Sequence, residues 1–140
     1  MEHERLIDIA DGMKDKAYAP YSGYRVGAAL LCADGTVVTG CNVENASYGA
    51  TVCAERAAIV KAVSEGKREF LKIAVSVSGG ALGMPCGICR QFISEFADGG
   101  FEVICANQQK DYRVYTLSEL LPHTFRGVTA QGSEPRGENI

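Results

Sequence analysis

Two short stretches contain the residues with the clearest chemical potential. Cys53-Ala54-Glu55-Arg56 supplies one thiol and one carboxylate, and Pro85-Cys86-Gly87-Ile88-Cys89-Arg90 supplies two more thiols. A catalytic zinc typically has three protein ligands and keeps its fourth position for water. Glu55 lies two positions after Cys53, so we expect it beside that water without being a ligand. The two stretches predict a Zn²⁺ site that generates hydroxide and moves protons.

Two other interpretations of the thiols remain open at this stage. A C-x-x-C motif is also typical of a redox pair, and a structural zinc site would recruit a fourth ligand such as Cys41 or His123. Neither alternative needs Glu55, and its position favours catalysis. The other cysteines, Cys32 and Cys105 together with Cys41, lie among apolar neighbours in predicted strands, where we expect them to be buried core residues.

Length and composition favour one soluble domain. The chain has 140 residues, of which 46% are hydrophobic and 22% charged. Its 14 Lys and Arg against 17 Asp and Glu give a net charge of −3, which argues against a long nucleic acid as partner. It has no apolar run long enough to span a membrane and no signal-like N-terminus. We therefore expect a cytoplasmic protein whose cysteines are metal ligands or core residues.

Helical and strand patterns alternate along the chain. Apolar spacing predicts helices over residues 3–17, 54–64, 86–97 and 116–121. Runs of apolar and β-branched residues predict strands over residues 24–32, 37–43, 70–77, 101–106 and 113–116. Asp34-Gly35 predicts a hairpin turn, and Thr116-Leu117-Ser118-Glu119 predicts a capping box. The many alanines of residues 54–64 favour a close approach of that helix to a neighbouring element.

This alternation predicts an α/β fold, a three-layer αβα sandwich with a central mixed sheet. Residues 1–127 form the single domain, and residues 128–140 are a polar and flexible C-terminal tail. Both thiol stretches then lie where a helix begins, and helix N-termini stabilise thiolates. Together with these N-termini, Arg56 compensates the negative charge of three thiolates.

The motifs together resemble one known family. C-A-E followed by P-C-x-x-C matches the zinc nucleobase deaminase signature, with Cys in place of the usual His. More specifically, the chain resembles the small homotetrameric cytidine deaminases, which have a cytidine deaminase-like αβα fold. The matching stretches are Ala19-Pro20-Tyr21-Ser22, Val26-Gly27-Ala28-Ala29, Gly40-Cys41-Asn42-Val43-Glu44-Asn45-Ala46, the two thiol stretches with Gln91, and Leu120-Leu121-Pro122.

The resemblance implies a reaction. Cys53, Cys86 and Cys89 would bind one Zn²⁺ per subunit, and Glu55 would carry protons from water to N3 of cytosine and to the departing amino group. The substrates would be cytidine and deoxycytidine, and the products uridine or deoxyuridine plus ammonia, a hydrolase reaction of pyrimidine salvage. The substrate is a small nucleoside, with neither nucleic acid nor membrane as partner.

The resemblance also implies substrate contacts. The backbone N–H of Ala54 would hold O2 of the base, and Asn42 and Glu44 would bind the ribose hydroxyls. Tyr24 stands where the family often has Phe. Stacking on the base would come from Phe125 of a neighbouring subunit in the homotetramer, and Tyr48 would reach a neighbour's site in the same way. Side chains at i and i+2 of a strand share a face, which agrees with the spacing of Asn42 and Glu44.

Three other functions compete with this one. The chain would fit a deaminase of another small aminopyrimidine, a polynucleotide editor, or a zinc-stabilised module without catalysis. The stretch from Asn42 to Ala46 favours an ordinary nucleoside, and the acidic balance disfavours a polynucleotide. Glu55 distinguishes an enzyme from a structural zinc module, because a structural site has no use for it.

Overall fold

A mixed five-stranded sheet forms the centre of the computed structural model, which describes residues 1–130. The strand order is β2-β1-β3-β4-β5; β3 and β4 are parallel, and the other neighbouring strands are antiparallel. Residues 131–140 of the predicted flexible tail lie outside the described residues. The elements in chain order are α1 (His3–Met13), η1 (Lys14–Lys16), β1 (Val26–Cys32), β2 (Val37–Cys41), η2 (Tyr48–Ala50), α2 (Ala54–Ser64), β3 (Phe70–Val77), α3 (Gly87–Ser94), β4 (Glu102–Ala106), β5 (Tyr112–Thr116) and α4 (Leu117–Leu120).

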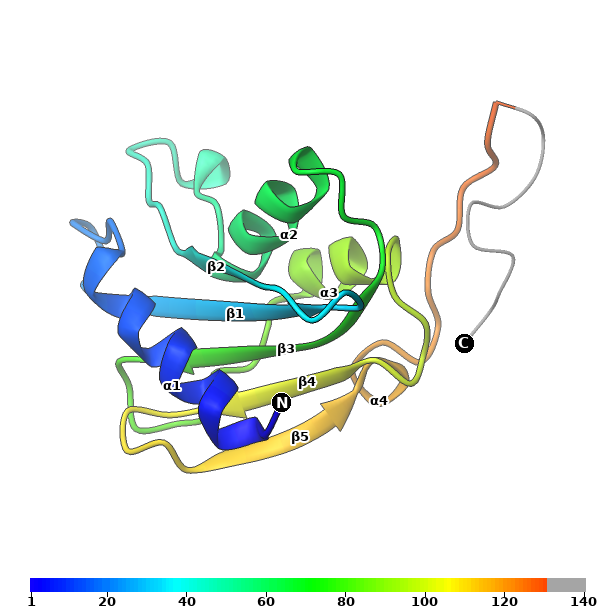
Figure 1. Ribbon diagram of the computed structural model, residues 1–140. Coiled ribbons are helices and arrows are strands. Elements are labelled where there is room, and N and C mark those ends of the chain that lie inside the picture. The colour runs from blue at the N-terminus through cyan, green and yellow to red at the C-terminus, as the bar shows by residue number, and fades with distance from the viewer. Residues whose placement is uncertain (131–140) are drawn as a thin grey trace.

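Helices cover both faces of the sheet, which confirms the predicted α/β sandwich (Figure 1). Helix α1 packs on one face, where its buried side chains include Leu6, Ile7 and Ala10. Helices α2 and α3 pack on the other face, where Ile59 of α2 and Ile93 of α3 are buried. The two thiol stretches adjoin α2 and α3, so the predicted zinc site lies on this second face of the sheet.

Helix α2 lies very close to strand β2. A Cβ atom added at Gly40 would lie 2.5 Å from the carbonyl oxygen of Ala54 and 2.6 Å from the backbone nitrogen of Ala58. Only a glycine leaves room for the helix backbone here. The close approach predicted from the alanine-rich sequence is thus confirmed, and it fixes the start of α2, where Cys53 is the N-cap residue.

The predicted element boundaries agree with the structure to different degrees. The bounds of α2 and β3 are confirmed, and the capping box of α4 is present, with Thr116 and Glu119 exchanging side-chain to backbone hydrogen bonds. Helix α3 is shorter than predicted, because it begins after Cys86 and ends at Ser94. The first predicted helix continues beyond Met13 only as the short 3-10 turn η1.

Two predictions near strand β2 are wrong in detail. The strand ends at Cys41, and Val43 makes only isolated bridges with Tyr18 and Val52. Cys41 is half-buried and its thiol donates to the carbonyl of Lys16 at 3.5 Å, so it is not the core residue expected. Cys32 and Cys105 are buried, as predicted.

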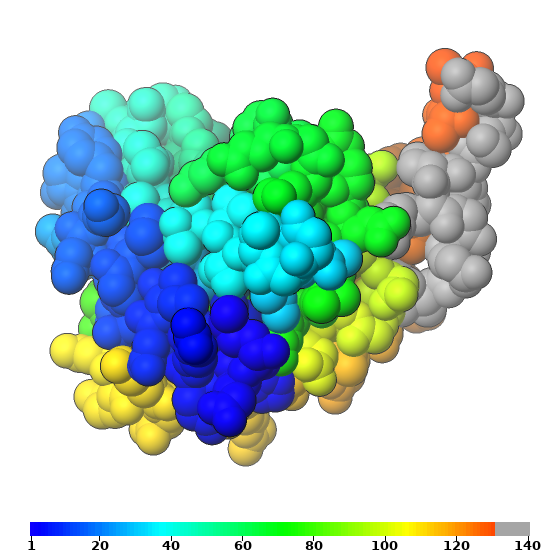
Figure 2. Space-filling model, viewed as in Figure 1, coloured from blue at the N-terminus to red at the C-terminus, as the bar shows by residue number. Residues whose placement is uncertain are grey.

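The segment after α4 leaves the body of the molecule. Figures 1 and 2 show that the last described residues project beyond the sheet and its helices. Within the described part of the chain, no helix has the length and apolar character needed to cross a membrane.

Candidate active site

The three predicted metal ligands lie at the beginnings of two helices. Cys53 is the N-cap residue of α2 and Cys86 is the N-cap residue of α3, both with extended backbone and without a side-chain capping bond. Cys89 lies in the first turn of α3. The free backbone N–H groups and the positive dipole end at each helix start favour negatively charged sulfur. The local fold therefore positions all three thiols at two helix starts, where a negative charge is favoured.

The thiols form one cluster. The sulfur atoms of Cys53, Cys86 and Cys89 all lie within 4.8 Å of one another, and those of Cys53 and Cys86 are 3.8 Å apart. A tetrahedral zinc with Zn–S bonds of about 2.3 Å separates two sulfur ligands by about 3.8 Å. Neither Cys41 nor His123 belongs to this group within residues 1–130. The donor set fits Zn²⁺ with three protein ligands, which disfavours the closed structural site.

Arg56 lies beside the cluster as predicted. Its Nη2 atom donates to the Cys53 sulfur at 3.4 Å and to the Thr51 carbonyl at 3.3 Å. Its buried Nε atom has no partner within the described chain. A hydrogen bond from Cys89 is the largest cause that lowers the pKa of the Cys53 thiol; partial burial opposes it, and the hydrogen bond from Arg56 adds to it. Arg56 is therefore placed to balance the charge of the thiolates.

Glu55 is buried next to the thiols. It lies in the first turn of α2 and only 4% of its surface is exposed. Removal from water is the main reason that its pKa rises to about 7. A carboxyl group with a pKa near neutrality accepts and releases protons with comparable ease at neutral pH. Its environment suits general acid and base catalysis, the role expected from the sequence.

A cavity of 210 Å³ opens onto this group. Its walls combine an apolar side with polar atoms near the thiols. The lining residues are Tyr24, Val26, Asn42, Thr51, Cys53, Ala54, Glu55, Val75, Val77, Met84 and Cys86. A larger cavity of 510 Å³ lies elsewhere, against Phe70 and Phe101, and contains none of the thiols. The chemistry of the lining, and not the volume, identifies the site.

Asn42 reaches this cavity although strand β2 has ended. Its buried side-chain amide accepts a hydrogen bond from the N–H of Val26 at 2.9 Å and donates one to the carbonyl of Tyr24 at 2.8 Å. A primary amide has two N–H donors and two oxygen lone pairs. One donor and one lone pair of Asn42 therefore remain for a ligand.

Glu44 faces a second cavity of 310 Å³, lined by Tyr21, Ser22, Glu44, Asn45, Tyr48 and Thr51. Thr51 lines both cavities, so the two are neighbours. The Glu44 carboxylate accepts hydrogen bonds from Ser22 and Tyr21, and the Ser22 bond is the largest cause of its lowered pKa. Asn42 and Glu44 lie beyond the end of strand β2, and they line two neighbouring cavities.

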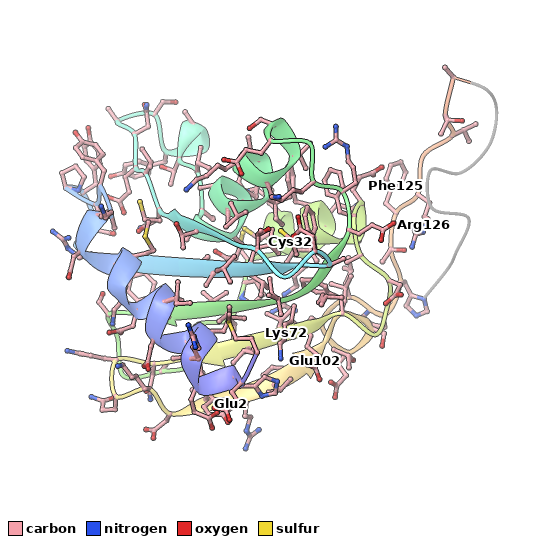
Figure 3. All side chains as sticks on the ribbon, in the orientation of Figure 1. Glu2, Cys32, Lys72, Glu102, Phe125 and Arg126 are labelled. Carbon is pink, nitrogen blue, oxygen red and sulfur yellow. The ribbon has the colours of Figure 1, made fainter. Side chains whose placement is uncertain are left out.

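The three aromatic residues that were expected to contact the substrate lie in different places. Tyr24 lines the cavity that contains Glu55, and burial raises the pKa of its hydroxyl. Tyr48 is 76% exposed and packs edge-on against Tyr21 in the second cavity. Phe125 is 77% exposed on the segment after α4, where Figure 3 shows it next to Arg126. Within the described residues, neither Tyr48 nor Phe125 lines the cavity of its own Glu55.

Sequence reasoning did not identify the apolar wall or the role of the loop before Cys53. Val75, Val77 and Met84 line the cavity, and Thr51 links the two cavities. The spacing of Thr51, two residues before Cys53, was the available signal. For the two valines the sequence offers no such signal, because their pattern is that of ordinary residues in a core strand.

Comparisons with known proteins agree with this geometry. The family model for the cytidine and deoxycytidylate deaminase zinc-binding region matches residues 1–105. The cytidine deaminase of Halalkalibacterium halodurans is 47% identical over 125 residues, which cover 89% of this chain and 95% of the relative. That of Mycobacterium tuberculosis is 47% identical over 109 residues, 78% of each chain.

Solved structures agree as well. The crystal structure of cytidine deaminase from Burkholderia pseudomallei superposes with a TM-score of 0.86 at 47% identity, covering 89% of this chain and all 100% of that one. The Mycobacterium tuberculosis structure gives 0.79 at 40% identity, covering 89% and 98%. The family match, these relatives and the cysteine cluster together show that the chain belongs to the cytidine and deoxycytidylate deaminase family.

Proposed function

We propose that this protein is a zinc-dependent enzyme that hydrolyses cytidine and deoxycytidine to uridine and deoxyuridine with release of ammonia. The observation that carries the proposal is the buried carboxyl of Glu55 beside three clustered thiols, at the end of a cavity with an apolar wall. A structural zinc site has no need of such a carboxyl. The relatives named above are cytidine deaminases, which supports the same substrate. The reaction belongs to cytoplasmic pyrimidine salvage.

Cys53, Cys86 and Cys89 hold one Zn²⁺ per subunit, and Arg56 offsets part of the negative charge. The mutual approach of the sulfur atoms supports this ligand set. When bound, zinc lowers the pKa of water to about 7 and so supplies a hydroxide nucleophile at neutral pH. The two helix N-termini lower the cost of assembling three thiolates in one place.

Glu55 moves the protons of the reaction. It accepts one proton of the attacking water and donates it to N3 of the cytosine ring, while the water oxygen bonds to C4. It then transfers the second proton of that water to the exocyclic nitrogen, the bond between C4 and this nitrogen breaks, and ammonia leaves. The product has a carbonyl at C4 and a proton on N3. A pKa of about 7 suits both directions of transfer.

The remaining cavity residues hold the substrate. The N–H of Ala54 is among the first amides of α2, which have no partner within the helix, and it holds O2 of the base. Tyr24 contacts the base from the cavity wall. Asn42 and Glu44 bind the sugar, because Asn42 retains a free donor and Glu44 is a carboxylate acceptor.

A neighbouring subunit completes each site in a homotetramer. Phe125 and Tyr48 are aromatic, strongly exposed and outside the cavity of their own Glu55, which supports contact with a neighbour's substrate. Stacking of a base on an aromatic ring contributes about 1–3 kcal/mol. Refolding Glu55→Ala and Phe125→Ala chains together tests this assembly. Mixed tetramers should be more active than the sum of the two parents, and purely additive activity in demonstrated mixed tetramers would contradict it.

One assay tests the function itself. Purified protein is incubated with cytidine, the ultraviolet absorbance is followed, and zinc is measured in the same sample. We expect conversion to uridine with one zinc per chain. A zinc-loaded, folded protein without turnover of cytidine or deoxycytidine would refute the proposal.

A further inference from the structure

A turn at residues 19–23 wraps around the carboxylate of Glu44. The turn closes with a hydrogen bond from the N–H of Gly23 to the carbonyl of Ala19 at 3.0 Å, and Gly23 has a positive φ of 72°. The turn directs the backbone N–H groups of Tyr21 and Ser22 at the Oε1 atom of Glu44, at 2.9 and 3.1 Å. The Ser22 hydroxyl donates to the other oxygen, Oε2.

One acceptor position of the Glu44 carboxylate remains free. A carboxylate offers about four lone-pair directions, two on each oxygen. The two backbone donors fill Oε1, and Ser22 fills one position on Oε2. The open position of Glu44 is therefore on Oε2, the same oxygen that the Ser22 hydroxyl holds. Ser22 therefore helps the two backbone donors to fix the plane of the carboxylate, and with it the direction of that open position.

The Ser22 hydroxyl is also connected to the base side of the site. Its oxygen accepts a hydrogen bond from the N–H of Tyr24 at 3.0 Å, and the carbonyl of Tyr24 accepts one from Asn42 at 2.8 Å. The oxygen of the Asn42 amide in turn accepts from the N–H of Val26 at 2.9 Å. A continuous chain of hydrogen bonds thus runs from Glu44 through Ser22 and Tyr24 to Asn42. The Ser22 side chain thus contacts both Glu44 and the backbone of Tyr24, whose side chain lines the cavity of Glu55.

We propose that Ser22 is a positioning residue that sets the direction of the free Glu44 acceptor toward a sugar hydroxyl and ties it to Tyr24. The proposal rests on the proposed role of Glu44 in sugar binding. Ser22 itself does not touch the reacting atoms. Its loss should weaken recognition of the sugar and leave the proton transfers by Glu55 intact. A purely structural role in the turn would instead affect all substrates equally.

The test compares two nucleosides that differ in the sugar. Cytidine carries the 2′ and 3′ hydroxyls, and 2′,3′-dideoxycytidine lacks both. Hydrogen bonds to charged groups correspond to changes of about tenfold or more in binding. We expect Ser22→Ala to raise the KM for cytidine about tenfold with kcat changed less than about threefold. On dideoxycytidine the KM should change less than about twofold; the inhibition constant against cytidine replaces KM if turnover is slow.

Matched variants accompany this comparison. Ser64→Ala removes an exposed hydroxyl at the end of α2 that donates to the carbonyl of Lys61, and it should behave like the wild type. Ser22→Thr keeps the hydroxyl and should restore most of the cytidine KM. Ser22→Gly removes the same hydroxyl and replaces Ser22→Ala if that variant fails to fold. Zinc content and melting temperature are measured for each variant.

The outcomes separate this proposal from the proposed function. Equal losses on both nucleosides, or an unchanged KM for cytidine, would overturn the role of Ser22. Glu44→Gln on the same pair of substrates tests the sugar contact independently. If Glu44→Gln discriminates between the nucleosides and Ser22→Ala does not, only the role of Ser22 is wrong. If Glu44→Gln does not discriminate either, the sugar contact of Glu44 is wrong and the Ser22 proposal falls with it.

Discussion

Replacing Gly40 by alanine should displace the helix that carries Glu55. The added Cβ would meet the Ala54 carbonyl at 2.5 Å and the Ala58 nitrogen at 2.6 Å, both backbone atoms that no side-chain rotation can move. Ordinary contacts begin near 3.4 Å. Strand β2 and the start of α2 must therefore separate by roughly 1 Å, and overpacking of this kind costs about 1–3 kcal/mol of folding free energy.

The displacement should affect activity as well as stability. Cys53 and Glu55 lie at the start of α2, and a shift of about 1 Å in a catalytic group can reduce the rate about a hundredfold. We expect Gly40→Ala to lower the melting temperature by several degrees and kcat/KM for cytidine by about tenfold to a hundredfold. Scanning calorimetry and the absorbance assay measure the two effects on zinc-loaded protein.

Gly12→Ala is the matched control. A Cβ at this exposed position in helix α1 has nothing within 4 Å, and alanine is favoured over glycine in a helix by up to about 1 kcal/mol. This variant should be as active as the wild type and slightly more stable. If Gly40→Ala matches it in stability and activity, the close approach of β2 and α2 does not position the site.

Three further predictions address the chemistry and the pH dependence. Glu55→Gln should retain zinc and fold but lose at least about 10²-fold in kcat, measured on cytidine; more than about a tenth of wild-type activity would assign proton transfer to another group. Cys89→Ala should lose zinc, assayed by metal analysis, together with thermal stability, and full zinc occupancy would remove it from the ligand set. Hydrogen bonds from Thr36 and Lys67 hold the pKa of Asp34 below its ordinary value of 3.8. Because ionised Asp34 is favoured in the folded state, its contribution is full above about pH 5 and is lost as the pH falls. Denaturation of wild type and Asp34→Asn should therefore differ at pH 7 and converge in acid; a constant difference would refute this.

The sequence predicts best where local pattern and tertiary environment agree. Helix α2 and strand β3 have the predicted bounds, because alanine spacing and β-branched runs match the periods that their surroundings require. The cysteine cluster was predictable from spacing, since a C-x-x-C motif at a helix start brings its two thiols together within one turn. The approach of Cys53 to that pair depends on the sheet order, and the sequence indicated it only through the ligand count of a catalytic zinc and the family motif.

The end of strand β2 and the surroundings of Glu44 could not be predicted from the sequence, for one physical reason. Strand β2 ends at Cys41 because the Asn42 side chain bonds to the backbone of β1 and its preceding loop. The carboxylate of Glu44 is held by the donors of the turn at residues 19–23. Such side-chain to backbone bonds join segments far apart in the chain, and no periodicity reveals them.

The apolar wall of the cavity is also part of the hydrophobic core. Val75 and Val77 line the cavity and are only 1% and 2% exposed, in the strand at the centre of the sheet. Enlarging the pocket there for a bulkier base would leave a void that the whole fold must tolerate. Tyr24, Thr51 and Met84 lie in loops, where a smaller side chain would not leave a void inside the sheet. Substitutions that change the shape of the cavity should therefore cost less stability in the loops than in the strand wall.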